Sequence, residues 1–353
     1  MKIWLDILTP KQANLFTELN LRLHMKGART LLTTRQYREV NELLALKGVK
    51  AVSVGRHGGV KLEEKLVQSA KRIQGLSMLI NEEKPDIAIS FSSPEAARVA
   101  FGLGIPHYCI SDSPHAEAVS KLTIPLSQKL FTPWVIPLYA WNKYGISPRD
   151  IIRYRGLDPA SWLDNYKPNR RALDSLKLDP DKPIIVIRTP EEFAAYLSGL
   201  PTSGSASEII GKILESQGNQ GQIVVLPRYE TQSERIARQF GSRITVCEHI
   251  VDAVALLSVS SVFVGGGGTM TAEAALLGIP VISYYPGKTT FIERFLINCG
   301  LVERFHDAGR VAQRAITISQ STEFQEFYRK RSMKLRKSME DPLNLIIKRI
   351  FKR

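Results

Sequence analysis

The sequence predicts an α/β protein built from two doubly wound domains with a cleft between them. Its 353 residues exceed the usual size of one domain. Short apolar runs alternate with amphipathic helical patterns along most of the chain, which is typical of βαβ units and a parallel sheet. Four consecutive glycines, Gly265 to Gly268, join one apolar run to a helical pattern late in the chain.

The first half of the chain contains one series of alternating strands and helices. We expect strands at 2–7, 28–33, 50–54, 87–90, 107–110 and 129–131. Apolar residues at helical spacing predict helices at 13–25, 36–46, 62–80 and 95–101. Together these elements form an N-terminal domain over 1–165. From about residue 134 the chain is rich in Pro, Trp and Tyr and lacks clear periodicity, so we expect the crossover between the domains there.

A second series occupies 166–320. Its strands are expected at 183–187, 222–226, 243–246, 261–264 and 280–283. Its helices are expected at 191–197, 208–216, 231–240, 252–257, 269–277 and 291–299. Residues 321–353 form basic C-terminal helices, which Pro342 divides in two. An apolar stripe that includes Leu343, Ile346 and Ile350 either docks on a domain or lies on a membrane surface.

Composition limits the partners. The formal net charge is +14, and much of it lies near the C-terminus. Such charge attracts nucleic acid, anionic membranes or phosphorylated substrates, although a solvated helix face is the plainer alternative. Basic and aromatic residues are not interleaved and no nucleic-acid motif is present, so nucleic acid is the least expected partner. Three widely spaced cysteines, no secretory signal pattern and no apolar run of about 18 residues favour the cytoplasm.

The four-glycine junction indicates an anion site. Glycines let backbone N–H groups approach a ligand closely, and the start of a helix offers unpaired donors and a partial positive charge. A phosphate or diphosphate fits such a place. A tight strand-to-helix turn without a ligand is the alternative, but two glycines would satisfy it.

The stretch from Val264 to Ser283, VGGGGTMTAEAALLGIPVIS, resembles the nucleotide-sugar motif of two GT-B relatives. One is the lipid-linked N-acetylglucosaminyl transferase of peptidoglycan synthesis, and the other is the UDP-N-acetylglucosamine 2-epimerase family. The whole chain most resembles an uncharacterised, largely archaeal domain-of-unknown-function family placed beside them. The resemblance implies a GT-B-like fold of two Rossmann-like domains over nearly the full length, the second binding a nucleotide sugar.

The resemblance also implies roles in that second domain. Gly265, Gly266, Gly267, Gly268 and Thr269 match the turn that holds the diphosphate. Glu273 matches a glutamate in the first helical turn that accepts hydrogen bonds from the ribose hydroxyls, a task that suits a carboxylate. A partner for the helix macrodipole is the alternative for Glu273.

Two arginines follow predicted strands of the same domain. Arg188 and Arg228 lie at strand carboxyl ends, where ligands of open α/β sheets bind. An arginine there can clamp a diphosphate with forked hydrogen bonds. Surface ion pairs with Glu191 or Glu230 are the alternative. GT-B enzymes manage the leaving diphosphate with such groups, so neither a cofactor nor a metal is expected, and the nucleotide sugar is a substrate.

The first domain supplies acid–base candidates. His57 lies in a glycine-containing loop after the third strand and could serve as a general base; a turn with a surface histidine is the alternative. Asp112, His115 and Glu117 follow the fifth strand in a stretch that echoes the His-x-Glu-Ala of the epimerases, without the Gly and Arg that continue their motif. Asp6 and Lys11, at the end of the first strand, are expected to face the cleft.

These observations favour a glycosyltransferase that uses a nucleotide-diphosphate sugar. The acceptor would be lipid-linked or a glycan, and the basic C-terminus would hold the enzyme peripherally on the inner face of an anionic membrane. One alternative is a nucleotide-sugar 2-epimerase or hydrolase that needs no second sugar acceptor. The other is a non-catalytic module that binds phosphate or nucleic acid.

Overall fold

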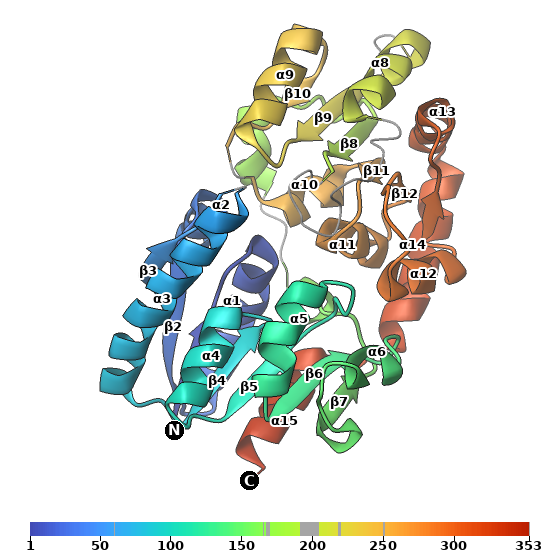
Figure 1. Cartoon of the computed structure of the whole chain (residues 1–353). Helices are drawn as coiled ribbons and strands as arrows, with labels where there is room; N and C mark the ends of the chain where they lie inside the picture. The colour runs from blue at the N-terminus through green and yellow to red at the C-terminus, as the bar shows by residue number, and fades with distance from the viewer. Residues whose placement is uncertain are drawn as a thin grey trace. The chain divides into compact units, whose positions relative to one another are not determined.

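The computed structural model describes residues 1–59, 61–164, 166, 170–190, 205–217, 220–249 and 251–352 (Figure 1). The chain folds into two compact units. Unit 1 comprises Met1–Trp162 and Glu340–Arg353, and unit 2 comprises Leu163–Met339. The chain therefore leaves unit 1 once and returns to it at the C-terminus.

Unit 1 contains a seven-stranded parallel sheet of order β3-β2-β1-β4-β5-β6-β7. In chain order its strands are β1 (Lys2–Asp6), β2 (Arg29–Gln36), β3 (Val52–Arg56), β4 (Ile87–Phe91), β5 (His107–Ile110), β6 (Lys129–Pro133) and β7 (Ile151–Tyr154). Its helices are α1 (Pro10–Met25), α2 (Arg38–Leu46), α3 (Leu62–Glu83), α4 (Pro94–Gly102), α5 (Glu117–Thr123), α6 (Tyr139–Asn142) and α15 (Pro342–Phe351), with α7 (Ala160–Leu163) at the boundary.

Unit 2 contains a six-stranded parallel sheet of order β10-β9-β8-β11-β12-β13. Its strands are β8 (Ile184–Arg188), β9 (Gln222–Leu226), β10 (Thr245–Val246), β11 (Val262–Gly265), β12 (Val281–Ser283) and β13 (Val302–Arg304). Its helices are α8 (Ala206–Gln217), α9 (Glu230–Phe240), α10 (Ala253–Val259), α11 (Thr269–Leu277), α12 (Phe291–Asn298), α13 (Ala308–Ser319) and α14 (Thr322–Lys337).

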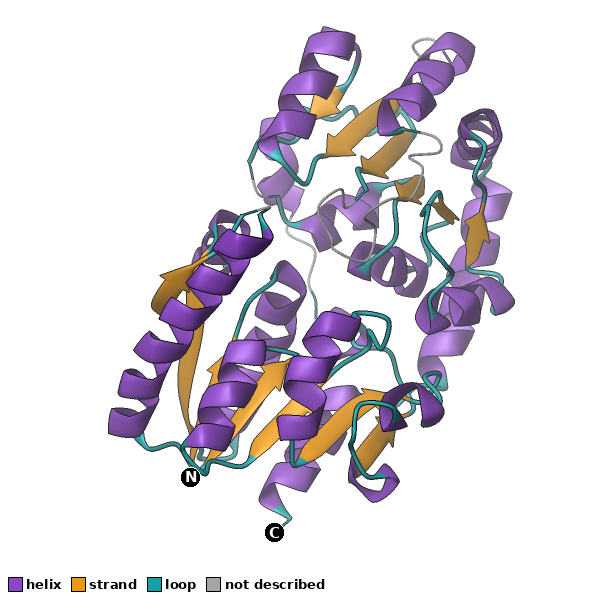
Figure 2. Ribbon diagram, viewed as in Figure 1, coloured by secondary structure: helices purple, strands orange, loops and turns teal. Residues whose placement is uncertain are grey.

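Helices cover both faces of each sheet (Figure 2). The central strands β1, β4, β8 and β11 are therefore almost entirely buried, whereas the edge strand β3 is mostly exposed. In unit 1, Ile3, Trp4 and Leu5 of β1 are completely buried. In unit 2, α8 and α13 pack together over one face of the sheet, and the core there includes Ile213 and Val311. Two parallel, doubly wound sheets confirm the predicted fold class.

The C-terminal helix α15 completes the core of unit 1. Leu343, Ile346, Ile347 and Ile350 are buried, so the apolar stripe of this helix is packed inside the protein. Asp341 caps its first turn and also accepts a hydrogen bond from Arg22 of α1. Within the described residues, no helix combines the length and apolar character needed to cross a bilayer.

Strands β7 and β13 and helices α5, α6, α7 and α13 were not predicted. Strands β7 and β13 have four and three residues and lack a long apolar run. Helix α13 did carry a signal, because Val311, Ala315 and Ile318 recur at helical spacing after the capping residue Asp307. The helix expected at 191–197 lies outside the described residues.

Candidate functional site

The glycine turn lies at the topological switch point of unit 2. Strands β8 and β11 are neighbours, and the strand order runs away from them in opposite directions. Arg188 at the end of β8 is in register with Gly265 at the end of β11. Ligands of doubly wound sheets bind outside the carboxyl ends of the strands at this position.

The first two glycines of the turn are required by packing. A Cβ atom at Gly265 would lie 2.5 Å from the Phe263 ring, and one at Gly266 would lie 2.7 Å from the backbone of Pro190. Both residues are buried. Their presence therefore has a steric explanation that involves no ligand, which accounts for two of the four glycines.

The last two glycines have a different environment. Gly267 and Gly268 have φ values of +88° and +96°, in the region that favours glycine. Gly267 packs against Tyr285, whereas Gly268 is exposed. The end of the turn is therefore open to a ligand.

Helix α11 begins without a side-chain cap. Gly268 is its N-cap and no acidic residue lies in its first turn, whereas α10, α12, α13 and α14 are capped by Asp252, Thr290, Asp307 and Ser321. Thr271 is 3% exposed, and its hydroxyl has no hydrogen-bond partner within the described residues. This hydroxyl is 3.3 Å from the position that a Gly265 Cβ would take. The N–H groups in the first turn of α11 can therefore donate hydrogen bonds to an anion.

Arg228 is held beside the open end of the turn. One terminal nitrogen of its guanidinium lies 3.4 Å from the position of a Gly268 Cβ. Its Nε donates to the Thr189 carbonyl at 3.3 Å, and its backbone N–H donates to the side chains of Thr189 and Gln232, both at 3.0 Å. The strand ends thereby fix a cation next to the start of α11.

Arg188 connects the ends of neighbouring strands. Its guanidinium donates to the Pro227 carbonyl at 2.9 Å and to the Leu226 carbonyl at 3.4 Å, and its own carbonyl accepts from the Tyr284 hydroxyl at 2.8 Å. The structure therefore gives this arginine a role in holding the strand ends together.

Glu273 lies in the second turn of α11 rather than the first. It is 3% exposed, and Thr269, the first residue of the helix, is partly exposed. Macrodipole interactions fade beyond the first turn, so that alternative explanation for Glu273 loses support.

A second cluster of charged groups occurs in unit 1. Lys11, in the first turn of α1, pairs with Asp112 after β5 and with Asp158 after β7, the latter at 2.6 Å. The Lys11 ammonium also lies 4.1 Å from the centre of the Phe91 ring. The Tyr154 hydroxyl donates to the second oxygen of Asp158. This arrangement places two carboxylates on one cation.

The environment separates the acidities of the two carboxyl groups. Burial would raise the pKa of Asp112, but Lys11 and the Ser113 hydroxyl lower it overall. Burial raises the pKa of Asp158, and the nearby charge of Asp112 raises it further. Burial opposes the charged form of Lys11, yet the two aspartates raise its pKa overall. Such a split between neighbouring carboxyl groups suits acid–base chemistry.

The structure brings only some of the predicted acid–base residues together. His115 keeps part of its surface exposed, and the partial burial of its imidazole lowers its pKa. The charge of Asp112 is close enough to oppose this shift. Glu117 is 62% exposed and pairs with Lys121 on the surface of α5. The geometry gives Glu117 a helix-surface ion pair and no contact with the Lys11 cluster within the described residues.

His57 lies away from this cluster. It follows β3, which is four places from β5 in the sheet, and this corresponds to roughly 19 Å. Its ring stacks on Tyr37 with centroids 4.9 Å apart, and its Nδ1 accepts from the Gly59 N–H at 3.1 Å. Partial burial and the charges of Arg35 and Lys65 lower the pKa of His57 to about 4. The ring is therefore neutral at pH 7, with Nε2–H left to donate.

Asp6 does not face a ligand site, contrary to expectation. It is completely buried, and its oxygens accept hydrogen bonds from Thr33, Ser93 and Arg72. Tyr154 and Asp158, by contrast, were not among the predicted site residues. Tyr154 is the last residue of β7 and Asp158 lies just after it, and this strand was not predicted. Their only signal in the sequence was their position after a short apolar run.

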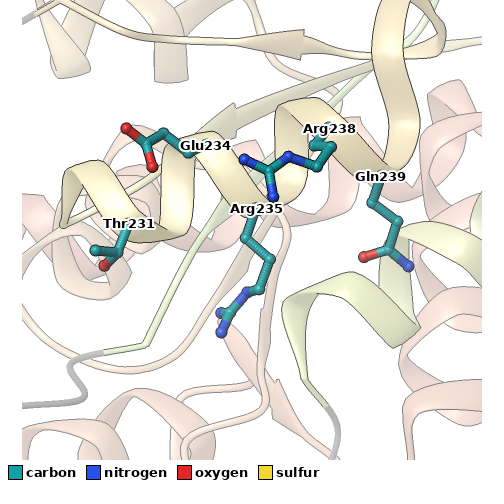
Figure 3. A pocket seen from close by; sticks show the side chains of 5 residues that line it. All are labelled: Thr231, Glu234, Arg235, Arg238 and Gln239. Atoms are coloured by element: carbon teal, nitrogen blue, oxygen red, sulfur yellow. The ribbon is translucent and has the colours of Figure 1, made fainter.

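A shallow depression beside α9 is lined by Thr231, Glu234, Arg235, Arg238 and Gln239, none of which was a candidate (Figure 3). Over the described ranges, no three His, Cys, Asp or Glu side chains are arranged to hold a metal ion.

Comparison with known proteins gives a family and a fold. A family model described as "Protein of unknown function (DUF354)" matches residues 1–353. An uncharacterised protein of Methanocaldococcus jannaschii, MJ0665, is 33% identical over 304 residues, which cover 84% of this chain and 85% of that protein.

Solved structures of two enzyme classes share the fold. The UDP-GlcNAc 2-epimerase of Neisseria meningitidis, bound to UDP-GlcNAc, matches all of both chains with a TM-score of 0.76 at 19% identity. The M. jannaschii UDP-GlcNAc 2-epimerase, in complex with UDP-GlcNAc and UDP, covers 91% of this chain and 94% of its own, with a TM-score of 0.69 at 15% identity. The spinosyn forosaminyltransferase SpnP covers 99% and 98%, with a TM-score of 0.63 at 15% identity. These matches confirm the predicted GT-B-like fold.

Proposed function

We propose that this chain, which belongs to the DUF354 family of proteins of unknown function, is a glycosyltransferase that uses a nucleotide-diphosphate sugar. One observation carries the proposal: α11 starts without a side-chain cap at the switch point of its sheet, and Arg228 lies beside its exposed N-cap, Gly268. The epimerases named above bind UDP-GlcNAc or UDP in the same fold, which supports a uridine nucleotide as the first ligand to test.

Unit 2 would bind the donor. The N–H groups of the first turn of α11 and the Arg228 guanidinium would donate hydrogen bonds to the diphosphate, and Glu273 would accept hydrogen bonds from the ribose hydroxyls. The same groups stabilise the negative charge that develops on the diphosphate as it leaves. Arg188 would act indirectly, by holding the ends of β8 and β9 together through its hydrogen bonds to the Leu226 and Pro227 carbonyls.

Unit 1 would supply acid–base groups. Asp112 stays ionised at neutral pH because Lys11 lowers the pKa of its carboxyl, so it can accept the proton of an acceptor hydroxyl. The acceptor oxygen then bonds to the anomeric carbon while the bond from that carbon to the diphosphate breaks. His115, close to Asp112, is the second candidate for this proton.

The first experiment measures nucleotide binding. Thermal shift and calorimetry with UDP, GDP and UDP-sugars should detect binding, with a stabilisation of about 2.7 kcal/mol at a hundredfold excess over Kd. Arg228→Gln should weaken the binding of UDP, whereas Arg238→Gln, which removes an exposed arginine of α9, should leave it unchanged. Equal binding by both variants, or no nucleotide binding by the wild-type protein, would contradict the proposal.

Epimerisation or hydrolysis is the alternative that the structural matches favour. Incubation with a UDP-sugar alone separates the two reactions, because a transferase needs an acceptor. Turnover without an acceptor, detected as a new epimer or as free sugar, would replace transfer with this alternative.

The peripheral membrane contact also remains a proposal. Helix α14 exposes a set of basic residues, which would attract an anionic surface with about 1 kcal/mol per residue. These are Arg329, Lys330, Arg331, Lys334 and Lys337. Flotation with anionic vesicles should therefore weaken as salt rises, and flotation that is insensitive to ionic strength would contradict an electrostatic contact.

A further inference from the structure

The loop after β12 supports the glycine turn. Tyr285 is 9% exposed, and the base of its ring meets the backbone of the turn, so that a Cβ atom at Gly267 would lie 2.8 Å from the Tyr285 Cδ2. The hydroxyl end of the ring meets Gly287 of the same loop, where a Cβ atom would lie 2.7 Å away. The position of this ring is therefore fixed by backbone at both ends, and the ring in turn limits where Gly267 can lie.

Arg304 of β13 holds this loop with both arms of its guanidinium. One terminal nitrogen donates to the carbonyls of Tyr285, at 2.8 Å, and Gly287. The other donates to the Thr289 hydroxyl and, at 3.3 Å, to Glu293. Four contacts from one forked donor fix the path of the loop, which a single ammonium group could not reproduce.

Glu293 holds the arginine in place. It is 5% exposed in the first turn of α12, and its other carboxylate oxygen accepts from the Ser283 hydroxyl, at the end of β12, at 2.5 Å. The chain Ser283–Glu293–Arg304 thus connects two strand ends, a helix start and the loop. Each member is buried or nearly so, with the Arg304 side chain 11% exposed.

We infer that Arg304 is a positioning residue for the anion site, acting through Tyr285 on the backbone of Gly267. Resting on the proposed function, this inference adds the part of unit 2 that fixes the N–H groups for the diphosphate. A turn with two glycines at positive φ has many conformations available, and binding must order it unless the surroundings already do so. The Arg304 fork and the Tyr285 ring supply that order before the ligand arrives.

The test compares the diphosphate with the nucleoside. In Arg304→Gln and in Tyr285→Leu, Kd for UDP should rise tenfold or more, while Kd for uridine, followed by ligand-observed NMR, should stay within twofold. Arg304→Lys should resemble Arg304→Gln because it keeps the charge but loses the fork. Arg310→Gln is the matched control, since Arg310 packs over Phe305 at 5.0 Å and makes no contact with the loop among the described residues.

Backbone order of the ligand-free protein, measured by ¹⁵N relaxation, gives a second readout. The amides of residues 267–269 should be more mobile in Arg304→Gln and Tyr285→Leu than in the wild type, with α13 unchanged. If the wild-type protein binds UDP but both variants keep the wild-type Kd and the wild-type order, the inference fails and the proposed function stands. An equal loss of UDP and uridine binding, with a lower unfolding temperature, would reduce Arg304 to a structural residue. Absence of UDP binding by the wild type would overturn both.

Discussion

At the scale of single residues, Asp6 and Asp112 show how contacts divide similar side chains between structure and chemistry. Asp6 is the last residue of β1, and Asp112 lies just after β5. Asp6 is completely buried, and its carboxylate accepts hydrogen bonds from Thr33 of β2, Arg72 of α3 and Ser93 before α4. Asp112 is 17% exposed and is held by Lys11. Of the two, only Asp112 is reached by solvent, which the proposed acid–base role requires.

Asp6→Asn should strongly destabilise unit 1. The change removes the buried carboxylate that Arg72, which is 1% exposed, hydrogen-bonds, and leaves Glu95 at 3.8 Å as its acidic partner. Breaking a buried pair costs up to about 3–5 kcal/mol. Urea unfolding followed by tryptophan fluorescence measures the loss, because all four tryptophans lie in unit 1. Glu42→Gln breaks an exposed pair with Arg38 and should cost under about 1 kcal/mol. Similar effects of the two variants would contradict the assignment.

The same pair predicts a pH dependence. The pKa of Asp6 is lowered by Arg72 and by its hydroxyl donors, which together outweigh its burial. Its contribution to stability is therefore present above the ordinary aspartate pKa of about 3.9 and is lost as the pH falls through the lower folded value. In Asp6→Asn the free energy of unfolding should fall less steeply with acid.

Asp112→Asn should reduce turnover and spare nucleotide binding. An amide cannot take a proton from an acceptor, and a lost general base lowers the rate by about 10²–10⁴-fold. Calorimetry with UDP should give the wild-type Kd, because the proposed diphosphate site belongs to unit 2. Glu117→Gln, at the exposed pair with Lys121, is the control and should keep full activity. An inactive Glu117→Gln would restore that residue as a candidate.

His57 should titrate far below the usual range. Its pKa of about 4 means that the unfolded chain binds a proton between about pH 6.5 and 4 that the folded chain does not. Stability due to this group is thus complete above about pH 6.5 and falls as the pH drops toward 4. The chemical shift of its ring protons measures the midpoint directly. A midpoint near 6.5 would contradict the stacked, neutral ring.

At the scale of elements, the glycine turn meets a packing requirement at its start and leaves its end exposed. Gly265 and Gly266 are explained by contacts with Phe263 and Pro190, while Gly268 is exposed at the start of an uncapped helix. The sequence predicted the turn and its anion site as a unit. The contact of Gly266 with the distant Pro190, and the side of the strand on which the Phe263 ring lies, could not be predicted from the glycines themselves, so the structure was needed to separate the two pairs.

Gly268→Ala should abolish diphosphate binding at a modest cost in stability. A residue with a side chain is strained at φ +96°, by about 1–2 kcal/mol, and the new Cβ would lie 3.4 Å from the Arg228 guanidinium. Gly241→Ala is the matched control, because Gly241 also has positive φ but no atom within 4 Å of its Cβ position. Both variants should lose similar stability, and only Gly268→Ala should lose UDP binding in calorimetry. Wild-type affinity for UDP in Gly268→Ala would show that the diphosphate binds elsewhere.

At the scale of the whole molecule, the course of the chain makes unit 1 depend on its C-terminal helix. The chain enters unit 2 at Leu163 and rejoins unit 1 at Glu340. The Glu340 side chain accepts a hydrogen bond from the backbone N–H of Arg155, and its own backbone N–H donates to the Arg155 carbonyl at 2.9 Å. The basic C-terminal segment is thus divided between the two units, with α14 in unit 2 and α15 in unit 1.

Ile350→Ala should destabilise unit 1 by about 2–5 kcal/mol, because it opens a cavity at a side chain that is 1% exposed. Its neighbour Phe351 is 43% exposed, so Phe351→Ala should cost well under half as much. Tryptophan fluorescence during urea unfolding reports this difference. An Ile350→Ala protein as stable as the wild type would contradict the packing of α15 in the core.

The sequence alone determined the alternation of strands and helices, the two parallel sheets and the glycine junction at the start of α11, because these depend on local periodicity and on the properties of single residue types. Tertiary structure alone decided which polar groups meet. Lys11, Asp112 and Asp158 are separated by long stretches of chain and come together only because β1, β5 and β7 end at one edge of a sheet. Tertiary structure also showed that Asp6 cannot face a ligand, because burial depends on the residues that surround a side chain after folding.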